Sequence, residues 1–217
     1  MLDGQERTIV DRVMREIFSL LLSGEIPLGG QLNEVALAER FQVSRGPVRE
    51  AVKQLQGRGL VLKEPYLKAR VVSLSLPEVI EVFQLREAVE GMAVRLATTA
   101  MSDDELDEML SSFDTTAASD SAIDLDLHVR IAEGCGNDRI RRLLCDELYY
   151  LLRLYRARSG NRPGRRGDAF AEHWQILRAM RARDAQLAES LMRAHIGRAT
   201  RSLQDVLIAE QDNSSKG

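Results

Sequence analysis

Three histidines and one nearby aspartate are the residues of this chain whose types and spacing fit metal chemistry. The sequence contains only His128, His173 and His195, and all three lie in segments with helical patterning. Asp124 precedes His128 by four residues, so one helix presents a carboxylate and an imidazole on the same face. One aspartate and three neutral imidazoles form a ligand set suited to Zn, Ni, Mn or a related divalent ion. Taken singly, each histidine is more often a structural residue.

Two arginines have the spacing of a DNA contact. Arg45 and Arg49 lie four residues apart, on one face of a short helical pattern and at its start. At the N-terminal end of a helix in the major groove, guanidinium groups can reach guanine edges or phosphates. Ser44 and the first backbone amides can add phosphate contacts. Two arginines on an exposed helix are usually only solvated. The DNA-binding interpretation therefore depends on the fold predicted for the residues around them.

Those elements predict a winged helix-turn-helix over residues 1–74. A first helix carries apolar residues from Ile9 to Leu21 and stops at Gly24. Two short helices follow, with Asn33 and Ser44 as their N-caps. The buried stripe of the second consists of Val48, Val52 and Leu55. Two runs rich in Val and Leu, at 60–64 and 67–73, then predict a β-hairpin.

The pattern changes at Ser75 to long helices with few breakers, which predicts an all-α six-helix bundle over residues 75–210. Its helices are expected at Pro77 to about Ala100, from Ser102, and at 121–134, 138–157, 168–182 and 184–208. The expected caps are the capping boxes Ser75/Glu78 and Ser102/Glu105, together with Asn137, Asp168 and Asp184. The segment 156–167, with five arginines, reads as an exposed basic connection, and 211–217 as a disordered tail. The predicted fold class is therefore mainly α.

Composition narrows the class of protein. The net charge is −3, but residues 1–75 sum to +2 and the remainder to −5, which places a basic segment beside an acidic body. No apolar run approaches the length of a membrane span, and the first residues do not form a leader. Two cysteines without a CxxC pair do not indicate a disulfide scaffold. We expect a cytoplasmic, nucleoid-associated protein that does not contact a membrane.

A resemblance to a known family rests on Pro27–Val61, and most specifically on Val43-Ser-Arg-Gly-Pro-Val-Arg-Glu-Ala51. This run resembles the winged helix of the GntR family of bacterial regulators over about 35 positions. The resemblance implies that Arg45 and Arg49 are the principal DNA contacts, supported by Ser44 and Gly46. Two departures are Val35, where the family often has a basic residue, and Lys68, near which its wing usually carries glycine. We therefore expect Lys63, Lys68 or Arg70 to contact phosphate.

The second half resembles the helical FCD effector domain of the FadR subfamily of GntR regulators. The matching residues are Asp124-Leu-Asp-Leu-His128, Gly136-Asn137, Glu172-His173 and Ala194-His195. The resemblance implies that Asp124, His128, His173 and His195 bind one divalent ion. Six helices rather than seven resemble the VanR-type subgroup, and Leu127, where phenylalanine is frequent, is a weak departure.

One carboxylate and three neutral imidazoles would leave a divalent ion at +1, so the resemblance also implies an anionic effector. Arg86 resembles the family arginine that faces this pocket and could clamp a carboxylate, although a salt bridge to Glu90 is an alternative. Asn137 could contact the effector or cap a helix.

The sequence thus predicts a bacterial transcription regulator, and not an enzyme, whose operator binding responds to a small organic acid held at a metal site. We expect a homodimer on an inverted-repeat operator, because helix-turn-helix proteins commonly bind two half-sites. A direct metal sensor is the first alternative. A metalloenzyme is the second, but it lacks an evident general base beside the ligands and leaves the winged helix unexplained.

Overall fold

The structure is a computed structural model that describes the backbone of residues 8–63, 67–114, 121–159 and 164–214. Within these ranges, the side chains of 113–114, 121–126, 159 and 211–214 lie outside the description. The chain divides into two compact units, Met1–Leu74 and Ser75–Gly217. None of the helices described is both long enough and apolar enough to span a membrane.

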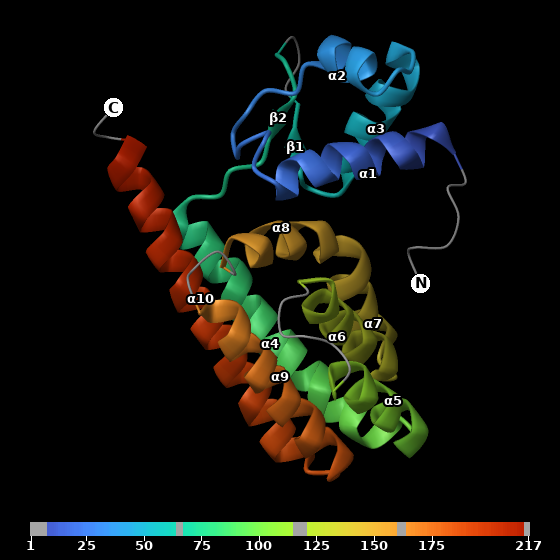
Figure 1. Ribbon diagram of the computed structural model, residues 1–217, viewed down its shortest axis with the longest axis vertical. Coiled ribbons are helices and arrows are strands. Elements are labelled where there is room, and N and C mark those ends of the chain that lie inside the picture. The colour runs from blue at the N-terminus through green and yellow to red at the C-terminus, as the bar shows by residue number, and fades with distance from the viewer. Residues whose placement is uncertain (1–7, 64–66, 115–120, 160–163, 215–217) are drawn as a thin grey trace. The chain divides into compact units, whose positions relative to one another are not determined.

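Three helices and a β-hairpin make up the described part of the first unit (Figure 1). Its elements are α1 Ile9–Leu22, α2 Glu34–Arg40, α3 Arg45–Gly57, β1 Val61–Leu62 and β2 Arg70–Val71. The strands are antiparallel, with Val61 opposite Val71, and Arg70 also forms a bridge with Gln31. The strands are shorter than the runs predicted at 60–64 and 67–73. The prediction of a winged helix-turn-helix is confirmed.

The apolar stripe of α3 anchors this unit. Val48, Val52 and Leu55 are all buried, as the helical spacing predicted. Asn33 caps α2 by accepting hydrogen bonds from the amides of Val35 and Ala36. Ser44 occupies the N-cap position of α3 but makes no side-chain capping bond, so the prediction holds for its position and not for its hydroxyl.

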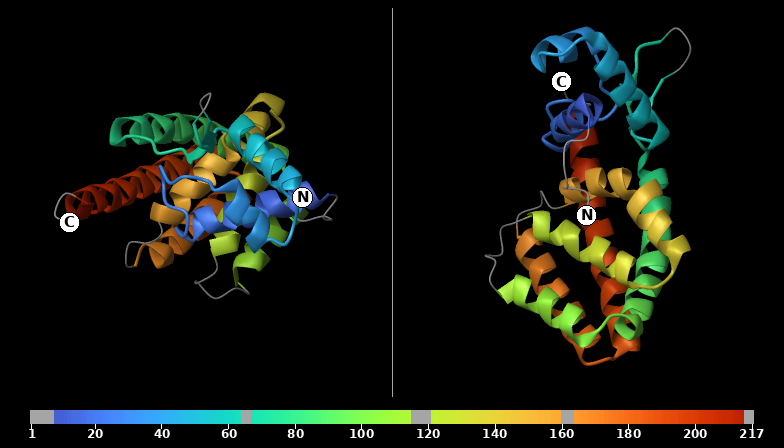
Figure 2. Two further views of the ribbon diagram at one scale, coloured as in Figure 1. Left: turned by 90° about the horizontal axis from the view of Figure 1, so that it is seen from above. Right: turned by 90° about the vertical axis from the view of Figure 1, so that its right-hand side faces the viewer.

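The described part of the second unit is entirely helical, which confirms the predicted all-α bundle. Its elements are α4 Leu76–Ala100, α5 Asp103–Asp114, α6 Ser121–Gly134, α7 Asp138–Arg142, the π-helix η1 Leu143–Glu147, α8 Tyr149–Ser159, α9 Arg165–Arg181 and α10 Ala185–Ser214. The long helices α4 and α10 make the most extensive contact in this unit, and α9 packs against α10 (Figures 1 and 2). The number of helices is six when α7, η1 and α8 are counted as one interrupted helix.

That interruption was not predicted. The helix expected at 138–157 changes to π geometry at Leu143–Glu147, and α8 lies at an angle to α7 (Figure 1). A π segment inside an α-helix often accompanies a functional site. Leu144 and Cys145, both buried in this segment, line a cavity that is described below.

Helix ends in this unit agree with the sequence at most caps and differ at two places. Asn137 and Asp184 accept hydrogen bonds from backbone amides at the starts of α7 and α10, as predicted. Asp168 is not a cap, because α9 begins at Arg165 after Gly164, whose positive φ of 81° suits glycine. The last helix runs to Ser214 and so continues into the segment predicted as a disordered tail from 211.

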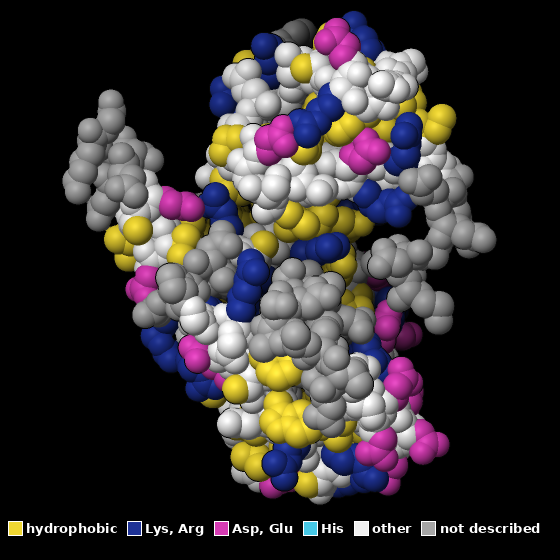
Figure 3. All heavy atoms as spheres, viewed as in Figure 1, with side chains coloured by type: hydrophobic (Ala, Val, Ile, Leu, Met, Phe, Trp, Pro, Cys, Tyr) yellow, Lys and Arg dark blue, Asp and Glu magenta, His cyan; other side chains and the backbone are white. Residues whose placement is uncertain are grey.

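Ion pairs between arginines and acidic side chains gather at the α5 end of the bundle (Figure 3). Arg181 donates two hydrogen bonds to Asp107, at 2.7 and 3.2 Å, and Arg183 pairs with Asp103. These side chains are at least one-third exposed. Solvent screening therefore limits their effect on stability.

Candidate metal centre and DNA-binding helix

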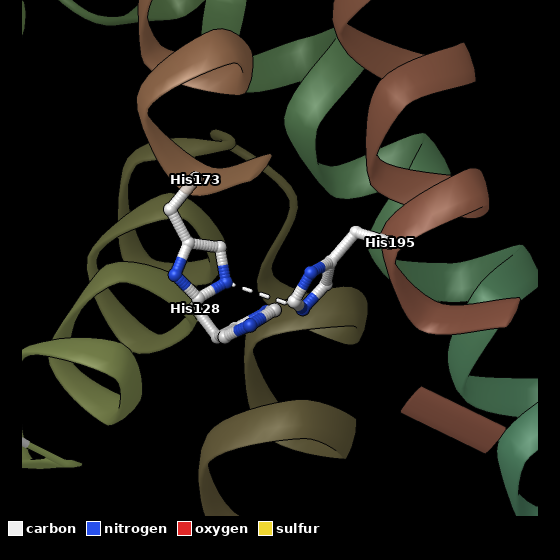
Figure 4. Close-up of side chains that lie close together, drawn as sticks. All are labelled: His128, His173 and His195. Atoms are coloured by element: carbon white, nitrogen blue, oxygen red, sulfur yellow. Dashed lines mark hydrogen bonds between the residues drawn. The ribbon is translucent and has the colours of Figure 1, made fainter. Parts of the chain in front are cut away.

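The three histidines, which are far apart in the sequence, meet at one point inside the helical unit. His128 comes from α6, His173 from α9 and His195 from α10 (Figure 4). One nitrogen of each lies within 4.8 Å of the others, and Nε2 of His173 is 3.2 Å from Nε2 of His195. All three side chains are buried, and none is visible on the face shown in Figure 3. The structure therefore brings together the histidines that the sequence assigned to one site.

Two buried glutamates hold the outer nitrogens of these rings. Nδ1 of His195 donates to Oε2 of Glu172 at 2.6 Å, and Nδ1 of His128 donates to Glu90. A histidine that ligates a metal usually donates its other ring N–H to a carboxylate in this way, which fixes the tautomer and leaves the Nε2 lone pair available. Nε2 of His128 is buried and has no hydrogen-bond partner in the described part of the chain. A buried polar atom without a partner is costly, so the arrangement fits an ion between the rings.

The surroundings keep the imidazoles of His128 and His195 neutral, as metal ligation requires. Burial, reinforced by the positive charge of Arg156, lowers the pKa of His128 to about 3. Burial, together with the neighbouring His173 and His128, holds the pKa of His195 well below its usual value. Both side chains therefore retain a free lone pair at neutral pH.

Glu90 is the first of two carboxylates on which several cations converge. It accepts hydrogen bonds from His128, from Nε of Arg86 at 2.7 Å and from Arg156. Burial alone would raise the pKa of Glu90, but the positive charges of Arg86 and Arg156, together with the hydrogen bond from His128, hold it well below the usual value. Arg86 thus forms the salt bridge that was the alternative to a role as effector clamp, and it does so beside the histidines.

Glu172 is the second such carboxylate, and its role was not predicted from the sequence. Besides His195, it accepts hydrogen bonds from Nη2 of Arg165 at 2.9 Å and from Nε of Arg198. Arg165 begins α9 seven residues before Glu172, two helical turns away, so their shared face could have been recognised.

The basic segment 156–167 was predicted to be exposed, and this prediction was wrong for two of its arginines, although residues 157, 164, 166 and 167 are exposed. The side chain of Arg156 is 11% exposed and that of Arg165 is 8% exposed. Each points inward because a buried glutamate beside a histidine accepts its hydrogen bond. Residues 160–163, between them, lie outside the described residues.

Of the other site residues predicted in this unit, one cannot be placed in detail and one has a structural role. Asp124 lies on α6 one turn before His128, but its side chain is outside the described residues, so its role as fourth ligand stays a prediction. Oδ1 of Asn137 accepts from the amides of Arg139 and Ile140 at 3.0 and 3.2 Å. Asn137 thus has the capping role that was the alternative to effector contact.

A small cavity adjoins the histidines on the side of the π-helix. It is lined by Glu90, His128, Val129, Leu144, Cys145, Tyr149, Leu152 and Arg156. Its volume of about 10 Å³ suits roughly one water molecule. An organic acid would therefore have to displace side chains to enter there.

The predicted DNA-reading residues lie on the surface of the first unit. Arg45 is the first residue of α3 and is exposed, as are Gly46, Lys68 and Arg70. The side chain of Arg49 is 59% exposed, and its Nε donates to Oε2 of Glu34 at 3.1 Å. Nζ of Lys63 donates to the other oxygen of Glu34 at 3.0 Å. One carboxylate on α2 therefore holds two cations that could otherwise face phosphate.

A winged helix-turn-helix followed by an all-helical unit with a buried histidine cluster defines a class of two-domain DNA-binding regulators. Residues 9–65 match the model described as "Bacterial regulatory proteins, gntR family", and residues 81–198 match the FCD domain. The chain belongs to the GntR family of bacterial transcriptional regulators, in the group that carries an FCD domain, which confirms the resemblance. These families are regulators that bind operator DNA and are not enzymes.

The sequence similarity to individual relatives extends over most of the length of both chains. The chain is 29% identical to the "HTH-type transcriptional repressor GlaR" of Escherichia coli (strain K12), covering 81% of this chain and 87% of that one. It is 28% identical to the "Probable D-xylose utilization operon transcriptional repressor" of Paenarthrobacter nicotinovorans, covering 87% and 86%. Among solved structures, E. coli McbR/YncC matches with a TM-score of 0.72 at 18% identity, covering 95% of this chain and 99% of that one, which supports the fold alone.

Proposed function

We propose that this regulator binds a small carboxylate at a divalent metal ion held by the histidine cluster, and that the bound acid changes its affinity for operator DNA. The observation that carries the proposal is the convergence of three buried histidines, two of which donate through Nδ1 to glutamates. His128, His173 and His195 would bind the ion, with Asp124 as the fourth ligand. Three nitrogens and one oxygen suit Zn, Ni or Mn. When bound, the ion supplies a positive charge with open coordination positions for a carboxylate.

The residues around the ion explain how a bound acid can alter the protein. Arg86 and Arg156 both bond to Glu90, which orients His128. The neighbouring cavity is too small for an acid, so an acid that bound there would displace side chains of the cavity lining, most of which lie on η1 and α8. Such a displacement gives the two states that effector control requires.

The protein is also proposed to bind an inverted-repeat operator as a homodimer, since a single winged helix covers only one half-site. Leu85 and Met92 support this proposal. They lie seven residues apart on one face of α4 and are 45% and 41% exposed, which would suit an apolar contact with a second copy. Footprinting should show protection of both half-sites. A monomer bound to one asymmetric half-site would contradict the proposal.

Calorimetry of small mono- and dicarboxylates against metal-loaded and chelator-treated protein tests the effector proposal. We expect acid binding only with metal present. Equal affinity in both forms would rule out a metal-bridged effector.

A direct metal sensor is the second candidate, because the same cluster could signal by ion occupancy alone. Operator binding at buffered metal concentrations, with and without added acid, separates the two. A change in operator affinity with metal but none with any acid would favour the sensor.

A further inference from the structure

Arg165 has a buried donor that its protein contacts do not use. Its Nη2 donates to Glu172 at 2.9 Å and lies 3.4 Å from Nδ1 of His195. Its Nη1 is buried and has no hydrogen-bond partner among the residues that the structure describes. A guanidinium group taken out of water needs its donors satisfied, so Nη1 calls for an acceptor that the described chain does not provide.

The balance of buried charges around the histidines also favours the binding of an anion. Three largely buried guanidinium groups, those of Arg86, Arg156 and Arg165, face two largely buried carboxylates, those of Glu90 and Glu172. Among the described residues, these five largely buried groups therefore sum to one excess positive charge. A divalent ion bound together with an ionised Asp124 would raise the excess to two. Uncompensated buried charge is costly, and a ligand with a single negative charge would remove only half of it.

We propose that the effector is a small acid with two negatively charged groups, and that Arg165 binds the second group while the ion binds the first. This inference rests on the proposed function and specifies the class of its ligand. Arg165 lies at Nδ1 of His195, across one imidazole ring from the Nε2 that would hold the ion. A short carbon chain between the two groups spans that separation. The second group accepts a charge-assisted hydrogen bond from Nη1, and a carboxylate or a phosphonate can serve.

Calorimetry of the full-length, Zn-loaded protein with butyrate, succinate and 3-phosphonopropionate tests this inference, because the three probes share a short chain and differ in the second group. At least one of the two probes that carry a second anionic group should bind tenfold or more tightly than butyrate. The stronger of the two identifies the chemistry of the second group. Butyrate binding as tightly as both would overturn the inference.

Substitution of Arg165 tests whether this side chain causes the preference for a second anionic group over butyrate. Arg165→Met should lower the affinity for the preferred dianion about tenfold and leave that for butyrate within threefold. Arg166→Met, at the exposed neighbouring position on α9, is the matched control and should change neither.

If circular dichroism shows that Arg165→Met is unfolded, Arg165→Lys provides the test, and it should keep a weakened preference for the dianion. An unchanged preference in a folded Arg165→Met variant would overturn the role of Arg165. If chelation abolished binding of all probes while their affinities were equal, the proposed function would stand and this inference alone would fail.

Discussion

Glu172 accepts a hydrogen bond from Nδ1 of His195 at 2.6 Å, although the two residues lie on different helices. The bond orients the imidazole so that Nε2 points to Nε2 of His173. Glu172, which is not itself one of the three histidines, thus determines that His195 directs Nε2 and not Nδ1 toward the other two rings.

Glu172→Gln should weaken metal binding by about 10- to 100-fold, since the amide is uncharged and cannot match the carboxylate as an acceptor for His195. Titration against a chromophoric chelator measures this affinity. Glu189→Gln, which alters a carboxylate paired with Arg193 and Arg95, is the control and should bind metal normally. Unchanged affinity in Glu172→Gln would show that the tautomer is fixed by other contacts.

Metal should stabilise the helical unit, because an ion that binds only the folded state adds free energy of unfolding. At a free metal concentration of 100 times Kd the gain is about 2.7 kcal/mol. For a chain of this size it corresponds to a rise in Tm of about 5–10 °C. Differential scanning fluorimetry with Zn and with a chelator measures the shift. His173→Ala should abolish it, and a full shift in that variant would exclude His173 as a ligand.

Arg49→Ala should lower operator affinity by about 1–3 kcal/mol if Arg49 contacts a base edge. The fold should not change, because the side chain is 59% exposed. An electrophoretic shift assay measures the affinity, with Arg12→Ala on α1 as a surface control. A folded Arg45→Ala/Arg49→Ala double variant that still binds normally would contradict the assignment of α3 as the reading helix.

Glu34→Gln should strengthen DNA binding several-fold. The substitution releases Arg49 and Lys63 from one carboxylate and removes a negative charge that would repel phosphate. Fluorescence anisotropy at several salt concentrations should show the gain shrinking as salt rises. Glu39→Gln, on an exposed position of α2, is the control. Weaker binding by Glu34→Gln would mean that Glu34 positions the two cations instead of competing for them.

Two glycine substitutions should have opposite effects on stability. A Cβ at Gly134 would lie 2.7 Å from Cγ and Sδ of buried Met101, so Gly134→Ala should destabilise the helical unit by about 1–3 kcal/mol. Gly197 lies within α10, and a Cβ there would meet no atom closer than 3.9 Å. Gly197→Ala should therefore stabilise by about 0.5–1 kcal/mol. Urea denaturation of both variants checks the pair, and equal effects would show that Met101 moves aside freely.

The sequence by itself determined the local structure and the residue types of both sites. Helical spacing predicted the buried stripe of Val48, Val52 and Leu55, and capping residues predicted the starts of several helices. These features depend on contacts within a few residues along the chain, which a sequence records directly. The resemblance to a family then grouped three histidines that spacing alone could not bring together.

Only the tertiary structure decided which side chains surround those histidines. Glu90 and Glu172, and the inward direction of Arg156 and Arg165, depend on the packing of α4, α8, α9 and α10. A segment rich in arginine is predicted from its sequence to be exposed, because an unpaired buried charge is costly. That cost is offset here by carboxylates 66 and seven residues away in the chain. The π-helix at Leu143–Glu147 likewise has no counterpart in the hydrophobic pattern, because it changes the backbone geometry within a helix without ending the apolar period.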